Sequence, residues 1–202
     1  ATDDTSQVSI DTLHIVAMPN ATGLQVSEIY VLSNSGDRFV AGFGQPIMHL
    51  SLPNGAASFS ADPNMMPDTL IPNGDGLDYY DAVPVGSGTA QIVFQYQLAG
   101  SNFVLDRPVF QNVSSINLLI QAEPQQLQVA STQFLNQGPQ SLPGQTQVFQ
   151  QYTARNLKPG DKLSIAISAP GASIDWRVIL GGALIAAGVI GLAAWQVRQR
   201  RT

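Results

Sequence analysis

The stretch whose side chains could most readily bind a metal or catalyse a reaction is acidic. Residues 71–81, IPNGDGLDYYD, place Asn73, Asp75, Asp78 and Asp81 around two glycines with no basic residue nearby. Calcium takes six to eight oxygen ligands, and loops that hold it commonly supply them from alternating residues. The stretch does not follow the twelve-residue EF-hand pattern, and the chain holds no second copy. It predicts either a calcium site or an exposed acidic turn, because Asp, Asn and Gly favour turns by geometry alone.

The same carboxyl groups have the wrong setting for acid–base catalysis. Hydrolysis of a glycan needs two carboxyl groups, one of them held in a cleft with a raised pKa. Three aspartates in a hydrophilic turn have no such asymmetry. We predict no catalytic role for them.

Soft metal ligands are also present. Thioether sulfur and imidazole nitrogen suit Cu(I), and a small exported β-sandwich is a known carrier type. Met48 and His49 are neighbours, so in a strand one of the two must point into the core. A copper site therefore competes with ordinary core packing as an alternative interpretation. Its candidate ligands are His14, Met18, Met48, His49, Met65 and Met66.

Nucleophilic catalysis finds little support. The chain has two histidines, no cysteine and no G-x-S-x-G motif. Ser87 in VGSGTA is flanked by glycines, but it precedes an expected strand instead of lying in a strand-to-helix turn. A P-loop is also missing from the sequence. We predict a protein that is not an enzyme, with no catalytic residues and no cofactor other than the calcium candidate.

Charge and composition point to an exported bacterial protein. Residues 1–170 hold thirteen acidic and five basic residues, a formal charge of −8, which disfavours nucleic-acid binding. The absence of cysteine excludes disulfides, thiolate zinc sites and iron–sulfur ligation. Exported eukaryotic domains more often carry disulfides. Only 11% of residues are charged, and the 18 glycines and 13 prolines suit a turn-rich extracytoplasmic β-protein.

The C-terminus predicts a membrane anchor. Residues 178–195 are uncharged and would span about 27 Å as a helix, close to the thickness of the hydrocarbon core. Trp176 and Trp195 bracket this run, as expected of side chains at the two membrane interfaces. Arg198, Arg200 and Arg201 follow it, which places the C-terminus in the cytoplasm and the N-terminal domain outside. We expect a single-pass protein of the bacterial plasma membrane.

One face of this helix carries small residues. Ala183, Ala187 and Gly191 recur at four-residue spacing, with Gly188 alongside. Small residues at that spacing allow a second helix to approach closely, so they predict helix packing with other transmembrane subunits.

The remainder of the chain predicts strands. Apolar and polar side chains alternate in LQVSEIYVLSN, TAQIVFQYQL and KLSIAISA, as in antiparallel sheets with one face on a core. Further strands are expected near 8–18, 39–52, 103–107, 112–121, 126–135 and 146–154, separated by Asn-, Pro- and Gly-rich turns. This spacing predicts an all-β, antiparallel, immunoglobulin-like β-sandwich.

The predicted organisation has five segments. Residues 1–122 form the sandwich, and residues 123–170 add strands that either continue it or make a second small β unit. A linker at 171–175, the transmembrane helix at 176–196 and a cytoplasmic tail at 197–202 complete the chain.

Several segments together resemble a known family. The stretches VSIDTLHIVAMPNATGLQVSEIYVLSNSGDRFVAG, LSLPNGAASFS, AQIVFQYQL and ARNLKPGDKLSIAISA are similar to bacterial membrane-anchored ectodomains of the carboxypeptidase-regulatory-like type. The resemblance covers most of residues 8–195 and consists of turns and strand cores. It implies an accessory role in the cell envelope and supplies no catalytic residues.

These observations predict a non-catalytic accessory or structural subunit of a cell-envelope complex. Its expected partners are the membrane, other transmembrane subunits and a basic exported protein that matches its acidic body. The two alternatives are a calcium-dependent adhesion or glycan-binding module and a periplasmic copper-handling protein.

Overall fold

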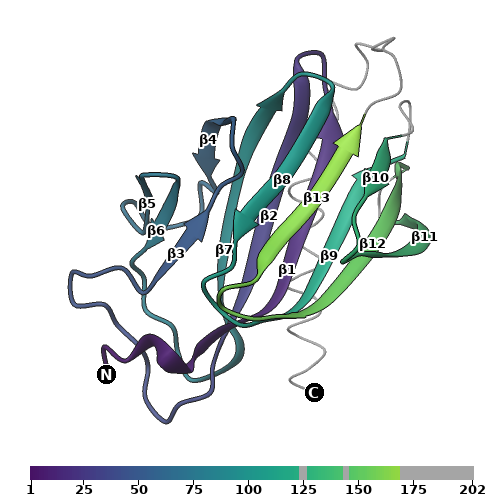
Figure 1. The fold of residues 1–202 in the computed structure, drawn as a ribbon. Coiled ribbons are helices and arrows are strands. Elements are labelled where there is room, and N and C mark those ends of the chain that lie inside the picture. Colours follow the sequence, from purple (N-terminus) through teal and green to yellow (C-terminus); the bar gives the residue numbers. More distant parts are fainter. Residues whose placement is uncertain (123–126, 143–145, 169–202) are drawn as a thin grey trace.

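The computed structural model describes residues 1–122, 127–142 and 146–168, which form an all-β body (Figure 1). A short 3-10 helix, η1 (Thr5–Gln7), precedes the strands. The strands are β1 (Val8–Pro19), β2 (Gly23–Asn34), β3 (Met48–Ser51), β4 (Ala56–Ala61), β5 (Leu70–Asn73), β6 (Gly76–Tyr79), β7 (Gly86–Ala99), β8 (Asn102–Pro108), β9 (Val113–Gln121), β10 (Gln128–Ala130), β11 (Leu135–Ser141), β12 (Val148–Leu157) and β13 (Lys162–Ser168).

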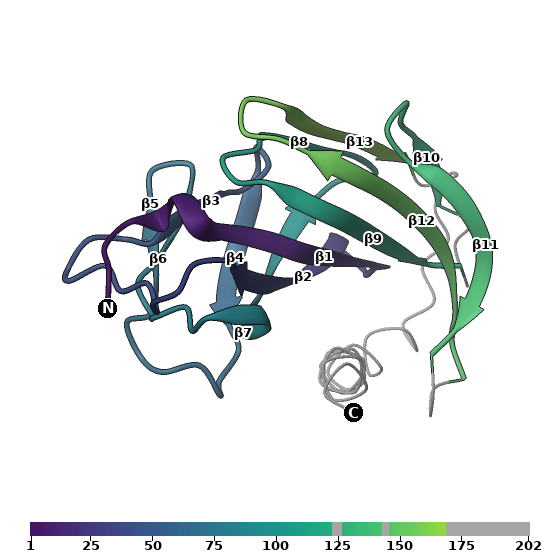
Figure 2. The same ribbon diagram turned by 90° about the horizontal axis from the view of Figure 1, so that it is seen from below.

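The strands form one large sheet and two small ones. The main sheet has the order β11-β12-β9-β1-β2-β7-β4, and the two small sheets have the orders β10-β13-β8 and β3-β6-β5. Figure 2 shows β8 and β13 as a second layer over one face of the main sheet. The expected layered, all-β architecture is therefore present. The pairing is antiparallel except between β1 and β9, which run parallel.

The alternation along β1 explains the layering. Leu13, Ile15 and Ala17 point into the large core between the layers, whereas Val16 and Met18 belong to a smaller cluster. Successive side chains of a strand point to opposite faces, so this smaller cluster lies on the other face of the main sheet. Its remaining buried members come from β2, β9, β12 and the residue that follows β11: Ile29, Leu119, Phe149 and Leu142.

Strands on both sides of residue 122 share the same sheets. β12 pairs with β9 over eight residue pairs, from Phe149↔Gln121 to Leu157↔Val113. β13 pairs with β8 from Lys162↔Pro108 to Ser168↔Asn102. Leu163, Ile165 and Ile167 of β13 also belong to the large core. The strands after residue 127 thus complete layers that begin before residue 122.

Two expected strands are shorter than the sequence predicts. The stretch 39–52 contains only β3, because residues 42–45 make a turn in which Gln45 N donates to Gly42 O at 2.8 Å. The stretch 126–135 contains the three-residue β10 and only the first residue of β11.

The two ends of the sandwich hold different strand ends and loops. Ser168 pairs with Asn102 beside the β7–β8 turn, so the described chain finishes at the end where β1 also finishes. The opposite end holds the start of β1, the finish of β2 and the loop between β2 and β3, residues 35–47. Figure 1 shows the N-terminus at this opposite end, away from the arrowhead of β13.

The predicted anchor falls outside the described residues. Within residues 1–122, 127–142 and 146–168, no helix is long and apolar enough to cross a membrane. The linker 171–175, the helix 176–196, the tail 197–202 and every residue assigned to membrane contact or helix packing lie beyond this part of the chain. These residues are Trp176, Trp195, Arg198, Arg200, Arg201, Ala183, Ala187, Gly188 and Gly191.

Candidate functional site

The acidic stretch 71–81 folds as a β-hairpin. β5 and β6 pair from Leu70↔Tyr79 to Asn73↔Gly76, and residues 73–76 make the turn. Gly74 lies at the turn with a φ of 61°, a conformation that glycine adopts without steric cost. β6 then pairs with β3 on its other side, which brings His49 opposite Asp78.

The three aspartates of the hairpin have different surroundings. Asp78 is only 5% exposed, whereas the side chain of Asp75 is 77% exposed. Asp81 is exposed, and its Oδ1 accepts a hydrogen bond from the backbone N–H of Ala82 at 2.8 Å. The exposed-turn interpretation therefore fits Asp75 and Asp81 and is wrong for Asp78.

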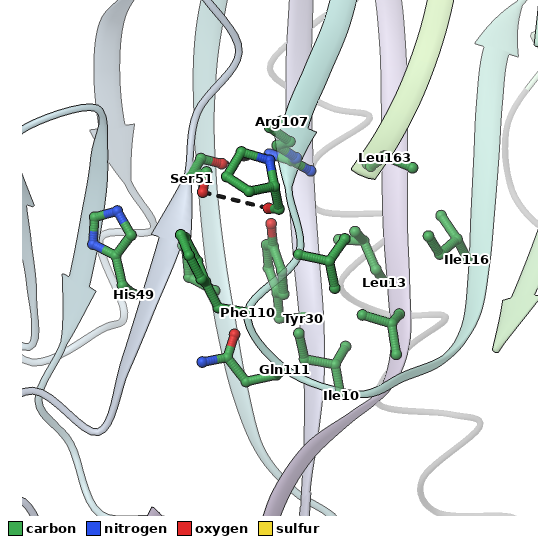
Figure 3. A pocket seen from close by; sticks show the side chains of 14 residues that line it. Ile10, Leu13, Tyr30, His49, Ser51, Arg107, Phe110, Gln111, Ile116 and Leu163 are labelled. Carbon is green, nitrogen blue, oxygen red and sulfur yellow. Dashed lines mark hydrogen bonds between the residues drawn. The ribbon is translucent and has the colours of Figure 1, made fainter. Parts of the chain in front are cut away.

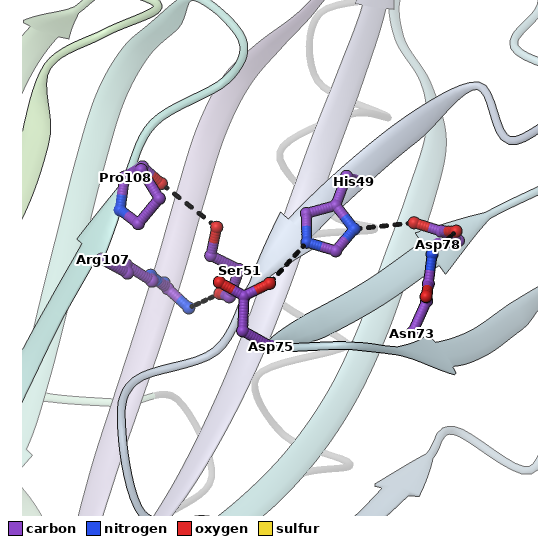
Figure 4. Close-up of polar contacts among 7 residues, drawn as sticks. All are labelled: His49, Ser51, Asn73, Asp75, Asp78, Arg107 and Pro108. Carbon is purple, nitrogen blue, oxygen red and sulfur yellow. Dashed lines mark hydrogen bonds and ion pairs between the residues drawn. The ribbon is translucent and has the colours of Figure 1, made fainter.

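Asp78 is held by two side chains. Its Oδ1 lies 2.7 Å from His49 Nδ1, and its Oδ2 accepts a hydrogen bond from Asn73 Nδ2 at 2.7 Å. Burial raises the pKa of the Asp78 carboxyl, but the hydrogen bonds from His49 and Asn73 and the charge of His49 outweigh it and hold that pKa below its ordinary value. Figure 4 shows His49 between Asp78 and Asp75, whose Oδ1 lies 3.4 Å from His49 Nε2.

This arrangement places the four predicted calcium ligands unequally. Asn73, Asp75 and Asp78 lie around His49, whereas Asp81 follows β6 and bonds to its own loop. In the described part of the chain, no group of three or more His, Cys, Asp and Glu side chains is arranged to hold a metal ion. Calcium binding by these residues stays a prediction.

The geometry around His49 differs from that of a catalytic triad. Its Nδ1 meets Asp78, as in a base oriented by a carboxylate. Its Nε2 faces Asp75, and the Ser51 hydroxyl donates to the carbonyl oxygen of Pro108 at 3.4 Å (Figure 4). The imidazole therefore bridges two carboxylates and is not directed at a hydroxyl nucleophile.

The candidate copper ligands are not brought together as one group. Met48 is buried in the large core, whereas Met18 belongs to the cluster on the other face of the main sheet. His49 pairs with aspartates, and Met66 is 69% exposed. His14 Nε2 is buried and has no hydrogen-bond partner among the described residues, and burial lowers the pKa of this histidine.

A buried ionic network lies at the centre of the body. Glu28 of β2 is 0% exposed, and its Oε2 accepts a hydrogen bond from Arg107 Nη2 of β8 at 2.8 Å. The Tyr30 and Tyr96 hydroxyls each donate to a Glu28 oxygen at 2.7 Å. Arg107 Nη1 donates to the Ser51 carbonyl oxygen at 2.9 Å. The network therefore links the main sheet to β8 and to β3 across the layers.

The pKa values of three members of the network are raised, for two different reasons. Burial raises the pKa of the Tyr30 and Tyr96 hydroxyls, so both stay protonated as donors. Burial alone would lower the pKa of Arg107, but the Glu28 carboxylate overrides this effect and raises it above its ordinary value. The two tyrosine hydroxyls and both Nη atoms of Arg107 donate to fixed acceptors, so the network holds charge in place within the body.

A small cavity adjoins this network. It encloses about 30 Å³ between β3 and the β8–β9 connection, room for a water molecule and too little for an organic substrate. Figure 3 shows Arg107 and Tyr30 at the cavity with Ser51 and Phe110. The Phe110 ring meets His49 edge-on at a centroid distance of 5.6 Å.

The sequence contains a signal for this network that composition and motif analysis missed. In NFVLDRP, Arg107 has the same parity as the buried Phe103 and Leu105, and in LQVSEIY, Glu28 has the parity of Val26 and Tyr30. A charged residue at an inward position of each of two strands indicates that the two form a buried pair, because an isolated buried charge is too costly.

No model of a known protein family matches the sequence, and no curated protein matches it.

Proposed function

We propose that this chain is a membrane-anchored, extracytoplasmic accessory or structural subunit of a bacterial cell-envelope complex, and that it is not an enzyme. The observation that carries the proposal is the apolar run 178–195, bracketed by the only two tryptophans of the chain and followed by three arginines. It follows the β-body, whose last described strand, β13, ends at Ser168, ten positions before the run begins.

The body supports a structural role through its internal connections. The buried charged side chains Glu28 and Arg107 bond to each other, and Glu28 also accepts hydrogen bonds from two neighbouring tyrosines. The partly buried His49 is likewise committed to Asp78 and Asp75. The layered all-β arrangement supports a β-sandwich. The immunoglobulin-like topology and the relation to carboxypeptidase-regulatory-like ectodomains are part of this proposal.

Membrane extraction and protease access test the anchor and its orientation. Alkaline carbonate should leave the chain in the membrane pellet, and protease added outside spheroplasts should digest the body. Release of the intact chain by carbonate would overturn the proposal. Protection of the body from external protease would overturn the assigned orientation.

Substitutions in the apolar run test its role as a subunit contact. Ala187→Leu and Gly191→Leu should preserve insertion, because leucine is apolar, but should block close approach of a partner helix. Ala193→Leu, which a helix would place away from these positions, is the matched control. The measurement is the amount of each membrane protein that co-purifies with the chain in mild detergent. Equal co-purification by all three variants would contradict assembly through this face.

A further inference from the structure

The loop between β2 and β3, residues 35–47, exposes two aromatic side chains. Phe43 is 74% exposed and Phe39 is 48% exposed. The loop lies at the end of the sandwich opposite Ser168, the end farthest along the strands from where the described chain finishes.

Phe43 lies in a turn whose geometry does not suit it. Gln45 N donates to Gly42 O at 2.8 Å, and the two central residues, Phe43 and Gly44, have φ values of 47° and 92°. Turns with two central residues of positive φ favour Asn, Asp and Gly. A bulky residue at such a position is a steric outlier. Gly42 cannot be replaced without strain either, because a Cβ there would overlap the Gln45 carbonyl oxygen.

Packing does not explain the choice of phenylalanine. Three-quarters of the Phe43 side chain is in solvent, so it gains little from burial to offset the unfavourable φ. Asparagine or glycine at position 43 would serve the fold better. A residue that the fold disfavours and that exposes an aromatic ring indicates a role outside the fold.

Backbone hydrogen bonds to neighbouring segments fix the base of this loop. Val40 exchanges backbone hydrogen bonds with Val83 at 3.0 and 2.9 Å, and Thr2 does so with Phe39 and Ala41 at 3.0 and 2.9 Å. On the other side, Asn34 Nδ2 donates to the Arg38 carbonyl oxygen at 2.8 Å. These bonds fix the stem of the loop before any partner arrives, which reduces the entropy lost on binding.

The surroundings of the loop are acidic. Residues 1–7, 35–47 and 80–85, which these hydrogen bonds join, carry four aspartates and one arginine, a side-chain charge of −3. Asp3, Asp4, Asp37 and Asp81 are all exposed, and Arg38 lies 3.6 Å from Asp37. This negatively charged end of the body would repel the anionic surface of a lipid bilayer, and it would also repel the same end of a second copy of the chain.

We propose that Phe43, together with Phe39, anchors this end of the body to an exported protein that presents an apolar pocket edged by lysine and arginine side chains. Aromatic anchors in a pocket supply most of the affinity of such interfaces, and the acidic surround speeds encounter with a basic partner. This inference rests on the proposed function in one respect: the partner is an exported protein because the body is proposed to lie outside the cytoplasm.

Photo-cross-linking tests the partner. The probe is p-benzoylphenylalanine placed at position 43 of the full chain in native membranes, with the same residue at position 135 as control, because Leu135 is also exposed, at 70%. We expect position 43, and not position 135, to cross-link a protein of basic isoelectric point, with a yield that falls at least tenfold as sodium chloride rises from about 50 to 500 mM. No adduct, a lipid adduct, a second copy of this chain, or an acidic or salt-insensitive partner would each overturn the proposal.

A single substitution separates binding from stability. Phe43→Asn should raise the melting temperature by about 2–4 °C, because asparagine tolerates the positive φ. It should weaken binding of the purified cross-linked partner at least tenfold, whereas Leu135→Asn should leave that affinity unchanged. A fall in melting temperature would show that Phe43 serves the fold, and unchanged affinity would show that it is no anchor.

The two proposals fail in different ways. If carbonate releases the chain but position 43 still cross-links a basic protein, the anchor proposal fails and this inference stands. If the chain stays in the membrane and position 43 gives no adduct, the inference fails and the anchor proposal stands.

Discussion

The buried pair Glu28–Arg107 connects the two layers of the body through individual side chains. The two side chains come from strands in different sheets and are 0% and 4% exposed. Removing two charges from water costs several kcal/mol for each ion, and the hydrogen bonds from Tyr30 and Tyr96 offset part of that cost. We infer that the pair contributes more to placing β8 over β2 correctly than to net stability.

Breaking the pair from one side should be severely destabilising. Arg107→Met leaves Glu28 buried without its cation, and we expect the free energy of unfolding to fall by about 3–5 kcal/mol. Adding Glu28→Gln removes the unpaired charge and keeps acceptors for both tyrosines, so the double variant should regain about 1–2 kcal/mol. Urea denaturation of the three proteins measures these differences. A double variant less stable than Arg107→Met would contradict this account.

The Asp78 carboxyl should make the body sensitive to acid. Its pKa in the folded protein lies below its ordinary value of 3.8, so its contribution to stability is present above about pH 4 and is lost as pH falls through the folded pKa. Asp78→Asn should lower the free energy of unfolding at pH 7 by about 2 kcal/mol and flatten its dependence on pH below 4.

The matched control for this prediction is Asp75→Asn. The Asp75 side chain is 77% exposed, so its loss should change stability by less than about 0.5 kcal/mol. Thermal melts between pH 2 and 7 make the comparison. Equal acid sensitivity in the wild type and Asp78→Asn would show that other carboxyl groups control acid unfolding.

At the scale of elements, the β3–β6 pair depends on a glycine. A Cβ at Gly76 would overlap the Leu50 carbonyl oxygen and lie 2.7 Å from His49 Nε2. Gly76→Ala should therefore push the two strands apart, and we expect a loss of about 1–3 kcal/mol of stability. Gly74→Asn is the control, because space is open there and asparagine tolerates its φ of 61°. Urea denaturation that ranks the control below Gly76→Ala would contradict this explanation.

Alternation predicted the long strands that face a core, whereas the four-residue β6, although buried, is too short to show it. β2, β7 and β13 carry an unbroken inward row such as Leu163, Ile165 and Ile167, and the sequence located all three. β4, β5 and β11 escaped prediction because only one of their residues, Leu70, is buried, so no apolar rhythm marks them. Edge strands of this kind form where a neighbour offers free hydrogen-bonding groups, which local sequence does not encode.

The site residues follow the same logic. The sequence singled out Asp75, Asp78 and Asp81 as one group because their spacing is local. The partner that distinguishes Asp78, His49, is 29 positions away and reaches it only through the β3–β6 pairing. Spacing alone therefore could not separate the buried aspartate from its exposed neighbours.

At the scale of the whole molecule, strands from both halves of the chain pair within the same sheets. β9 lies between β1 and β12 in the main sheet, and β8 lies at the edge of a sheet that β13 and β10 complete. The parallel pairing of β1 with β9 joins the first strand of the chain to its second half. Cooperative units follow such shared sheets and cores more closely than positions in the sequence.

This connectivity predicts that the strands on both sides of residue 122 open together. In native-state hydrogen exchange on the full chain in mild detergent, the inner backbone N–H groups of β1, β9, β12 and β13 should share one opening free energy, that of global unfolding. The β5–β6 hairpin should open at lower free energy, since β5 is an edge strand in the described part of the chain and three of its four residues are exposed. Exchange of β12 and β13 as a separate, less stable unit would instead support a second small β unit after residue 122. These two strands pair with β9 and β8, so they can open independently only if those pairings contribute little to the stability of β12 and β13.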